Sequence, residues 1–121
     1  MSCRGIRGAT TVEENSEKAI LSETKVLLKT MFSENGIDID EVASIFFSLT
    51  PNLNATFPAQ AARELGLTNT PLFCLQEVDV PDSLKSCIRL LIHVNTTKKQ
   101  SEMTHVYLKK AVSLRPDQAK K

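Results

Sequence analysis

Apolar and polar residues alternate with a period of two from residue 87 to residue 95. Successive side chains of a β-strand point to opposite faces, so this pattern predicts a strand. One face would carry Ile88, Leu90, Ile92 and Val94, and the other would carry Cys87, Arg89, Leu91 and His93. The predicted strand therefore has one wholly apolar face and a second face with an arginine at its centre.

Four further segments have the composition of short strands. Residues 3–11 combine apolar residues with glycines, which permit close approach of another backbone. Residues 42–49 form a β-rich apolar run, and residues 72–80 form another that is closed by Pro81-Asp82. A last strand is predicted at residues 112–114.

Three segments have helical signals. The sequence Thr11-Val12-Glu13-Glu14 matches a capping box and predicts the start of the first helix, and Asn35-Gly36 predicts its end. Residues of this segment recur at the three- and four-residue steps of one helix face: Ile20, Thr24, Leu27, Leu28 and Met31. Residues 57–65, with Pro58 in the first turn, predict a second helix, and residues 104–111 predict a third.

The predicted elements alternate in the order β-α-β-α-β-β-α-β. This order is typical of an α+β protein in which the helices pack on one face of a mixed β-sheet. Several of the strands are apolar on both faces, although the helices are few. A sheet with too little helix to cover it often completes its core by oligomerising.

The length of 121 residues favours one domain, which we place at residues 1–115, followed by a flexible polar tail at residues 116–121. Fifteen Lys and Arg balance fourteen Asp and Glu, which argues against a nucleic-acid partner. The longest uninterrupted apolar run has four residues, Leu72-Phe73-Cys74-Leu75, so no membrane-spanning helix is expected. Three cysteines without a Cys-x-x-Cys motif indicate reduced thiols and a cytoplasmic protein.

Charged residues inside strands are the most informative chemical signal. Arg89 lies between Ile88 and Leu90, Arg7 has a similar place in the first strand, and Glu77 ends an apolar stretch. Each could belong to a structural ion pair or to a solvated edge strand. Together they favour a pocket that binds an anion through arginine and a hydroxyl through a carboxylate.

Other catalytic patterns are weak. The two histidines have no cysteine or histidine at metal-ligand spacing, and there is no glycine-rich phosphate loop and no nucleophile elbow. Cys74 and His93 both lie on predicted strands, but any globular chain offers a pair of this kind. No metal site is therefore expected.

Several motifs, in order along nearly the whole chain, resemble the AroH-class, bacillus-type monofunctional chorismate mutases. They are Arg4-Gly5-Ile6-Arg7-Gly8-Ala9-Thr10-Thr11, Thr50-Pro51-Asn52-Leu53, Phe57-Pro58-Ala59, Cys74-Leu75-Gln76-Glu77, Cys87-Ile88-Arg89, His105-Val106-Tyr107-Leu108 and Leu114-Arg115-Pro116-Asp117. The resemblance implies a homotrimer with a ferredoxin-like, pseudo-α/β-barrel arrangement and active sites at the subunit interfaces. It also implies rearrangement of the small molecule chorismate to prephenate, in phenylalanine and tyrosine biosynthesis, without a cofactor.

The resemblance also assigns roles to residues. Arg89 would donate to the ether oxygen and to a substrate carboxylate, Arg7 and Tyr107 would bind a carboxylate, and Glu77 would accept from the ring hydroxyl. The segment with Phe73, Cys74, Leu75 and Gln76 would line the pocket. Phe57, Ala59 and Leu114 would form an apolar wall, with Arg63 and Arg115 near the mouth. Gln60 departs from the lysine of many relatives, and Phe73 is bulkier than the usual residue.

Two alternatives remain open at this point. One is a trimeric enzyme of the RidA kind that processes imines or enamines, which has a similar fold class and an interface arginine but different sequence motifs. The other is a non-enzymatic trimer that binds a small anion through the same arginines.

Overall fold

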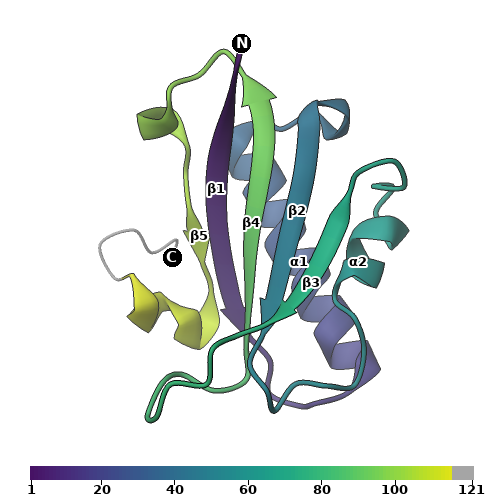
Figure 1. Cartoon of the computed structure of the whole chain (residues 1–121), viewed down its shortest axis with the longest axis vertical. Coiled ribbons are helices and arrows are strands. Elements are labelled where there is room, and N and C mark those ends of the chain that lie inside the picture. The colour runs from purple at the N-terminus through teal and green to yellow at the C-terminus, as the bar shows by residue number, and fades with distance from the viewer. Residues whose placement is uncertain (116–121) are drawn as a thin grey trace.

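A five-stranded mixed sheet forms the centre of the computed structural model, which describes residues 1–115. The strands lie side by side in the order β3-β2-β4-β1-β5 (Figure 1). Their bounds are β1 Ser2–Thr11, β2 Val42–Leu49, β3 Leu72–Gln76, β4 Cys87–Thr96 and β5 Val106–Tyr107. The helices are α1 Glu17–Asn35 and α2 Ala59–Glu64, with short 3₁₀ helices η1 Ile39–Glu41, η2 Gln100–Glu102 and η3 Lys109–Leu114.

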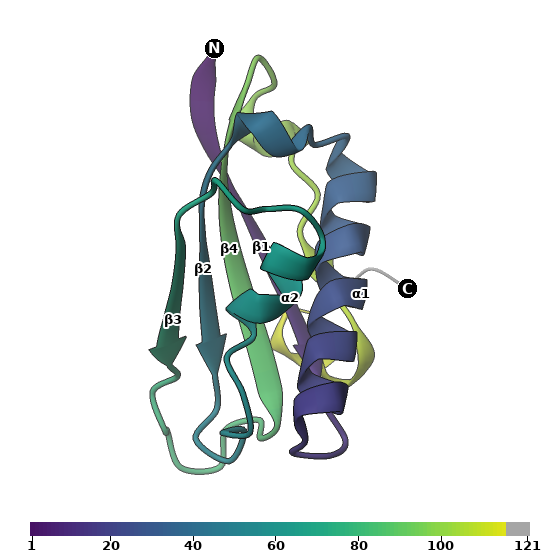
Figure 2. The same cartoon turned by 90° about the vertical axis from the view of Figure 1, so that its right-hand side faces the viewer.

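Strand β4 is the centre of the sheet, antiparallel to both of its neighbours, β1 and β2. The outer strands β3 and β5 run parallel to β2 and β1, respectively. Both α-helices lie on the same side of this sheet (Figure 2). The predicted α+β class, with helices on one face of a mixed sheet, is confirmed.

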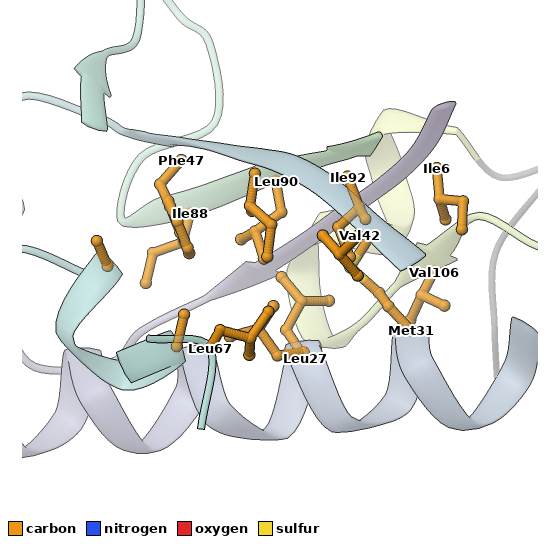
Figure 3. Close-up of a cluster of buried hydrophobic side chains, with 14 of the residues drawn as sticks. Ile6, Leu27, Met31, Val42, Phe47, Leu67, Ile88, Leu90, Ile92 and Val106 are labelled. Carbon is orange, nitrogen blue, oxygen red and sulfur yellow. The ribbon is translucent and has the colours of Figure 1, made fainter. Parts of the chain in front are cut away.

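Helix α1 covers the apolar face of the sheet. All five positions predicted from its periodicity are buried, and Leu27 and Met31 point from α1 toward Ile92 and Val106 (Figure 3). The alternate residues of β4, from Ile88 to Val94, are buried on this side. The period of two in β4 and the period near 3.6 in α1 therefore meet in one core.

The predicted end of α1 is confirmed, but its predicted start is wrong. Gly36 has a φ of 59° and its N–H donates to carbonyl oxygens of the last turn, as a left-handed cap does. At the other end Ser16 is the N-cap and accepts a hydrogen bond from the N–H of Ala19. Thr11 cannot cap the helix because it is the last residue of β1, where it pairs with Cys87.

Three other predicted boundaries also need correction. Only residues 109–111 of the helix predicted at 104–111 are helical, as part of η3, because Val106 and Tyr107 pair with Gly8 and Ala9 at the edge of β1. Residues 112–114 belong to η3 and are not a strand. Strand β3 ends at Gln76, where β2 also ends, so the predicted extension to residue 80 is an irregular loop. The tail predicted at residues 116–121 lies outside the described part of the chain.

The face of the sheet opposite α1 and α2 is the open face. It faces the viewer in Figure 1 and carries exposed apolar side chains, with Phe46 39%, Phe73 58% and Leu75 45% exposed. The ring of Phe46 makes edge contacts with Phe73 and with His93, with centroids 6.2 Å and 5.6 Å apart. Within residues 1–115, no helix has the length and apolar character needed to cross a membrane.

Gly8 allows α1 to lie close to β1, and this gives a test of the fold. A Cβ at Gly8 would lie 2.3 Å from the sulfur of Met31, which is fully buried, whereas a Cβ at Gly5 would lie 3.6 Å from Leu91. We expect Gly8→Ala to lower the free energy of unfolding by about 1–3 kcal/mol, because the core must repack. Gly5→Ala, on the same strand, should change it by less than about 1 kcal/mol. Urea unfolding measures both, and equal effects would contradict this account of α1 packing.

Candidate active site

One row of paired residues crosses the open face. Leu75 of β3 pairs with Ser48 of β2, which pairs with Arg89 of β4, and Arg89 pairs with Ala9 of β1. Ala9 in turn pairs with Tyr107 of β5. The register of the sheet therefore places Arg89 in the middle of the row, with an apolar residue at one end and a tyrosine at the other.

Arg89 and Glu77 form an ion pair at this centre. The guanidinium Nε lies 3.5 Å from Glu77 Oε2, and their side chains are 49% and 26% exposed. The N–H of Glu77 donates to the carbonyl oxygen of Leu49, which fixes the backbone just beyond the end of β3. Because half of the Arg89 side chain is exposed, its guanidinium is accessible to a ligand as well as to Glu77.

Two adjoining hollows share Arg89 as a lining residue. One, of about 210 Å³, is also lined by Glu77, Cys87 and Leu114. The other, of about 250 Å³, is also lined by Arg7, Ser48 and Leu75. The structure thus gathers Arg7, Glu77, Arg89, Leu75 and Leu114, which the sequence had singled out, around one pair of hollows.

Tyr107 lies on the same side of the sheet but is buried. Its side chain packs in a small cluster with Ala9, Cys87 and Ala111, and Leu84 and Leu114 lie against this cluster. Residue Ala111 belongs to η3, so this short helix covers the β5 end of the row. The ring of Tyr107 therefore packs in the same cluster as Leu84, Cys87 and Leu114, which line the hollow beside Arg89.

Arg7 and Arg115 are close to one histidine. The backbone N–H of Arg7 donates to Nδ1 of His105 at 3.0 Å, so Nδ1 carries no proton. Burial lowers the pKa of His105, and the positive charges of Arg7 and Arg115 lower it further. Arg115, which was expected at the mouth of the pocket, is thus close enough to share an electrostatic environment with Arg7.

The remaining predicted residues lie at the edge of β3. A groove of about 420 Å³ there is lined by Phe57, Cys74, Leu75 and Gln76, together with the loop after β2. Burial raises the pKa of the Cys74 thiol, while a backbone hydrogen bond at Ala59 and the charge of Arg63 act in the opposite direction. The side chain of Phe57 is 69% exposed and that of Phe73 is 58% exposed.

Within one chain, the predicted site residues therefore form two groups. The first surrounds Arg89 on the open face, and the second surrounds Cys74 near α2, which packs on the opposite side of the sheet (Figure 2). Leu75 lines hollows of both groups. Only the first group combines arginines with a carboxylate, which are groups suited to a small anion that carries a hydroxyl.

Two residues of the open-face site were missed in the sequence. Ser48 Oγ donates to Glu77 Oε2 at 2.6 Å, and Cys87 lines the hollow beside Arg89. Burial raises the pKa of the Cys87 thiol more than the neighbouring Arg89 lowers it, so this thiol stays protonated near neutral pH. The signal for Cys87 was its place two residues before Arg89 on the same strand face.

Comparison with known proteins identifies the family. A family model described as chorismate mutase type I matches residues 3–118. The chain belongs to the chorismate mutase type I family. Chorismate mutases are isomerases, and this assignment confirms the activity expected from the sequence and decides against the imine-processing and non-enzymatic alternatives.

Individual chorismate mutases agree with the family match. The chain is 49% identical over 118 residues to chorismate mutase AroH of Bacillus subtilis (strain 168), covering 97% of this chain and 93% of the relative. It is 48% identical over 115 residues to chorismate mutase AroH of Thermus thermophilus, covering 94% of both chains. A solved chorismate mutase from Clostridium thermocellum superimposes with a TM-score of 0.89 and 50% identity, over 90% of this chain and 97% of that one.

The lowered pKa of His105 predicts how stability depends on pH. In the unfolded chain histidine has a pKa of about 6.5. His105 therefore binds a proton more readily in the unfolded chain than in the folded one, where its pKa is lowered. The His105 contribution is therefore complete above the unfolded pKa and is lost as the pH falls through the lower folded pKa. We expect this chorismate mutase to lose more stability between about pH 7.5 and 5 than the variant His105→Asn, which keeps an acceptor but does not titrate. If the free energy of unfolding fell equally with pH in both proteins, the lowered pKa of His105 would be contradicted.

Proposed function

We propose that the open-face site around Arg89 converts chorismate to prephenate by positioning the substrate and stabilising charge. The observation that carries this proposal is the half-exposed guanidinium of Arg89, paired with Glu77 at the meeting point of two hollows. A fixed guanidinium next to a carboxylate can recognise both the acidic groups and the hydroxyl of one small molecule. An assay of chorismate disappearance tests the activity directly.

The rearrangement sets simple requirements for the protein. A carbon–oxygen bond breaks and a carbon–carbon bond forms within one molecule, so the reaction transfers no proton and needs no nucleophile from the chain. The substrate must first take up a compact conformer, and holding it there can lower the barrier by several kcal/mol. Negative charge then develops on the ether oxygen as its bond to carbon breaks.

Arg89 is the residue we assign to that oxygen. A fixed hydrogen-bond donor at a developing negative charge typically contributes about 3–4 kcal/mol to the transition state. Arg7, with the Tyr107 hydroxyl, would hold a carboxylate, and Glu77 would accept from the ring hydroxyl. Leu114 would supply apolar wall and Arg115 a charge near the entrance. Arg7, Glu77, Arg89 and Leu114 line the two hollows, which supports the roles given to these four residues.

The second group of residues leads us to propose a homotrimer with shared active sites. The β3 edge, with Phe57, Ala59, Arg63, Phe73 and Cys74, would approach the open face of a neighbouring copy and complete its pocket, with Gln76 beside it. Exposed apolar residues on the open face support association, because monomeric proteins rarely leave such a patch uncovered. Gln60 offers no charge here, and its amide donates to Glu64.

The remaining parts of the proposal concern the setting of the enzyme. We propose that residues 1–115 act as one domain and that the protein works in the cytoplasm in the synthesis of phenylalanine and tyrosine. All three cysteines are free within the described chain, which agrees with a reducing compartment. The expected lack of a metal and a cofactor stays a prediction.

Replacing Arg89 by lysine tests the proposed chemistry. A lysine keeps the charge but loses the planar fork that can donate to two acceptors at once. We expect Arg89→Lys to lower kcat by about 100-fold or more, with little change in the urea midpoint. Arg4→Lys is the matched control, because Arg4 lies on β1 at the far end of the sheet and donates to the carbonyl oxygen of Lys98. If both variants kept kcat/KM within a few-fold, the role assigned to Arg89 would be wrong.

Mixing two inactive variants tests the shared site. We expect Arg89→Ala and Arg63→Glu each to abolish most activity, one through the open face and the other through the β3 edge. In randomly mixed trimers about one site in four would then combine two intact halves and recover activity. Sedimentation should give three times the chain mass of 13.4 kDa. No recovery on mixing, with each variant still trimeric, would place both arginines in a site formed by a single chain.

A further inference from the structure

Ser48 is the only hydroxyl that the described contacts show on the carboxylate of Glu77. Its Oγ donates to Glu77 Oε2 at 2.6 Å, a distance typical of a hydroxyl bound to an ionised carboxylate. Ser48 lies on the open face directly opposite Arg89, its cross-strand partner. It also lines the hollow that contains Arg7 and Arg89. It therefore lies within the site, although nothing in the reaction calls for a serine.

The two described contacts of the Glu77 carboxylate fall on the same oxygen. Arg89 Nε and Ser48 Oγ both approach Oε2. Glu77 itself follows the end of β3, so its side chain extends from an irregular segment rather than from the sheet. The arginine pair is half exposed and by itself would hold the carboxylate weakly. The short hydrogen bond from the rigid strand β2 is the stronger restraint.

We propose that Ser48 is a positioning residue that holds Oε2 of Glu77 and thereby presents Oε1 to the hydroxyl of the substrate. This inference rests on the proposed function of the site. When the Arg89 guanidinium turns to the ether oxygen and a carboxylate of chorismate, its hold on Glu77 weakens. Ser48 keeps its own hydrogen bond, because it makes no contact that the substrate must replace. The carboxylate thus keeps its orientation through the reaction.

A pair of substitutions with equal shape isolates the hydroxyl. Ser48→Thr keeps an Oγ donor on a strand residue. Ser48→Val introduces a side chain of nearly the same volume as threonine but without a donor. We expect Ser48→Val to have a kcat/KM about 10-fold or more below that of Ser48→Thr, as for loss of a hydrogen bond to a charged group. Ser44→Val is the control, since Ser44 lies on the same strand and its Oγ contacts His93 Nδ1 at 3.2 Å. It should stay within a few-fold of the wild type.

A substrate without the ring hydroxyl separates positioning from a general structural effect. If Ser48 acts through Glu77, the difference between Ser48→Val and Ser48→Thr should largely disappear with chorismate that lacks this hydroxyl. It should also disappear in a Glu77→Gln background, because coupled residues are not additive. A merely structural role would reduce kcat/KM equally for both substrates and would lower the urea midpoint. Ser48→Ala repeats the comparison if the valine variant does not fold.

The outcomes for Ser48 and for the proposed function can be told apart. Equal kcat/KM values for the threonine and valine variants, with Arg89→Lys strongly impaired, would overturn the role of Ser48 alone. Full activity of Arg89→Lys would overturn the proposed function of the site, whatever the Ser48 variants show. A valine defect that persists with the dehydroxylated substrate would show that Ser48 does not act through Glu77.

Discussion

The pairing of Arg89 with Glu77 makes the rest of the site possible. A guanidinium in the middle of a central strand is costly to desolvate unless a carboxylate lies beside it. Glu77 supplies that carboxylate from the loop after β3, and Ser48 and Leu49 of β2 hold it in place. The pair lies on the open face, where water and a ligand can reach it. The charge is therefore compensated in the free protein and still available for binding.

The uneven cover of the sheet connects the fold to the proposed assembly. Both α-helices pack on one side of the sheet, where their core residues contact the apolar side chains of the strands (Figures 2 and 3). On the open face, Phe46, Phe73 and Leu75 remain exposed. This is also the face that carries Arg7 and Arg89. Burying the exposed apolar residues against a second copy would stabilise the protein by roughly 25 cal/mol for each Å² of apolar surface. The same contact would bring the β3 edge toward Arg89.

Much of the fold could be predicted because its signals are local. The alternation in β4, the apolar run of β2 and the glycine at the end of α1 each depend on a few neighbouring residues, and all three predictions were confirmed. The two-residue strand β5 could not be predicted, because it exists only through pairing with β1, nearly a hundred residues away. The capping box at Thr11 failed for the same reason, since the ladder with β4 takes priority over the local motif.

The candidate site shows the same division between local and distant information. Arg89 could be singled out from its place in an apolar strand. The partners of Glu77 could not be found, because a serine within an apolar run gives no sign of which carboxylate it will face. Its contact depends on the register between β2, β3 and β4. Register is set by the whole sheet and is not visible in any single segment.

The alternation of β4 also has a consequence for how this protein can change over time. Even-numbered residues from Ile88 to Val94 belong to the core, whereas odd-numbered ones point to the open face with the proposed site. Selection for a new ligand can therefore act on one set while the other keeps the chain folded. Variation among descendants of this chain should follow the parity of the residue number along that strand.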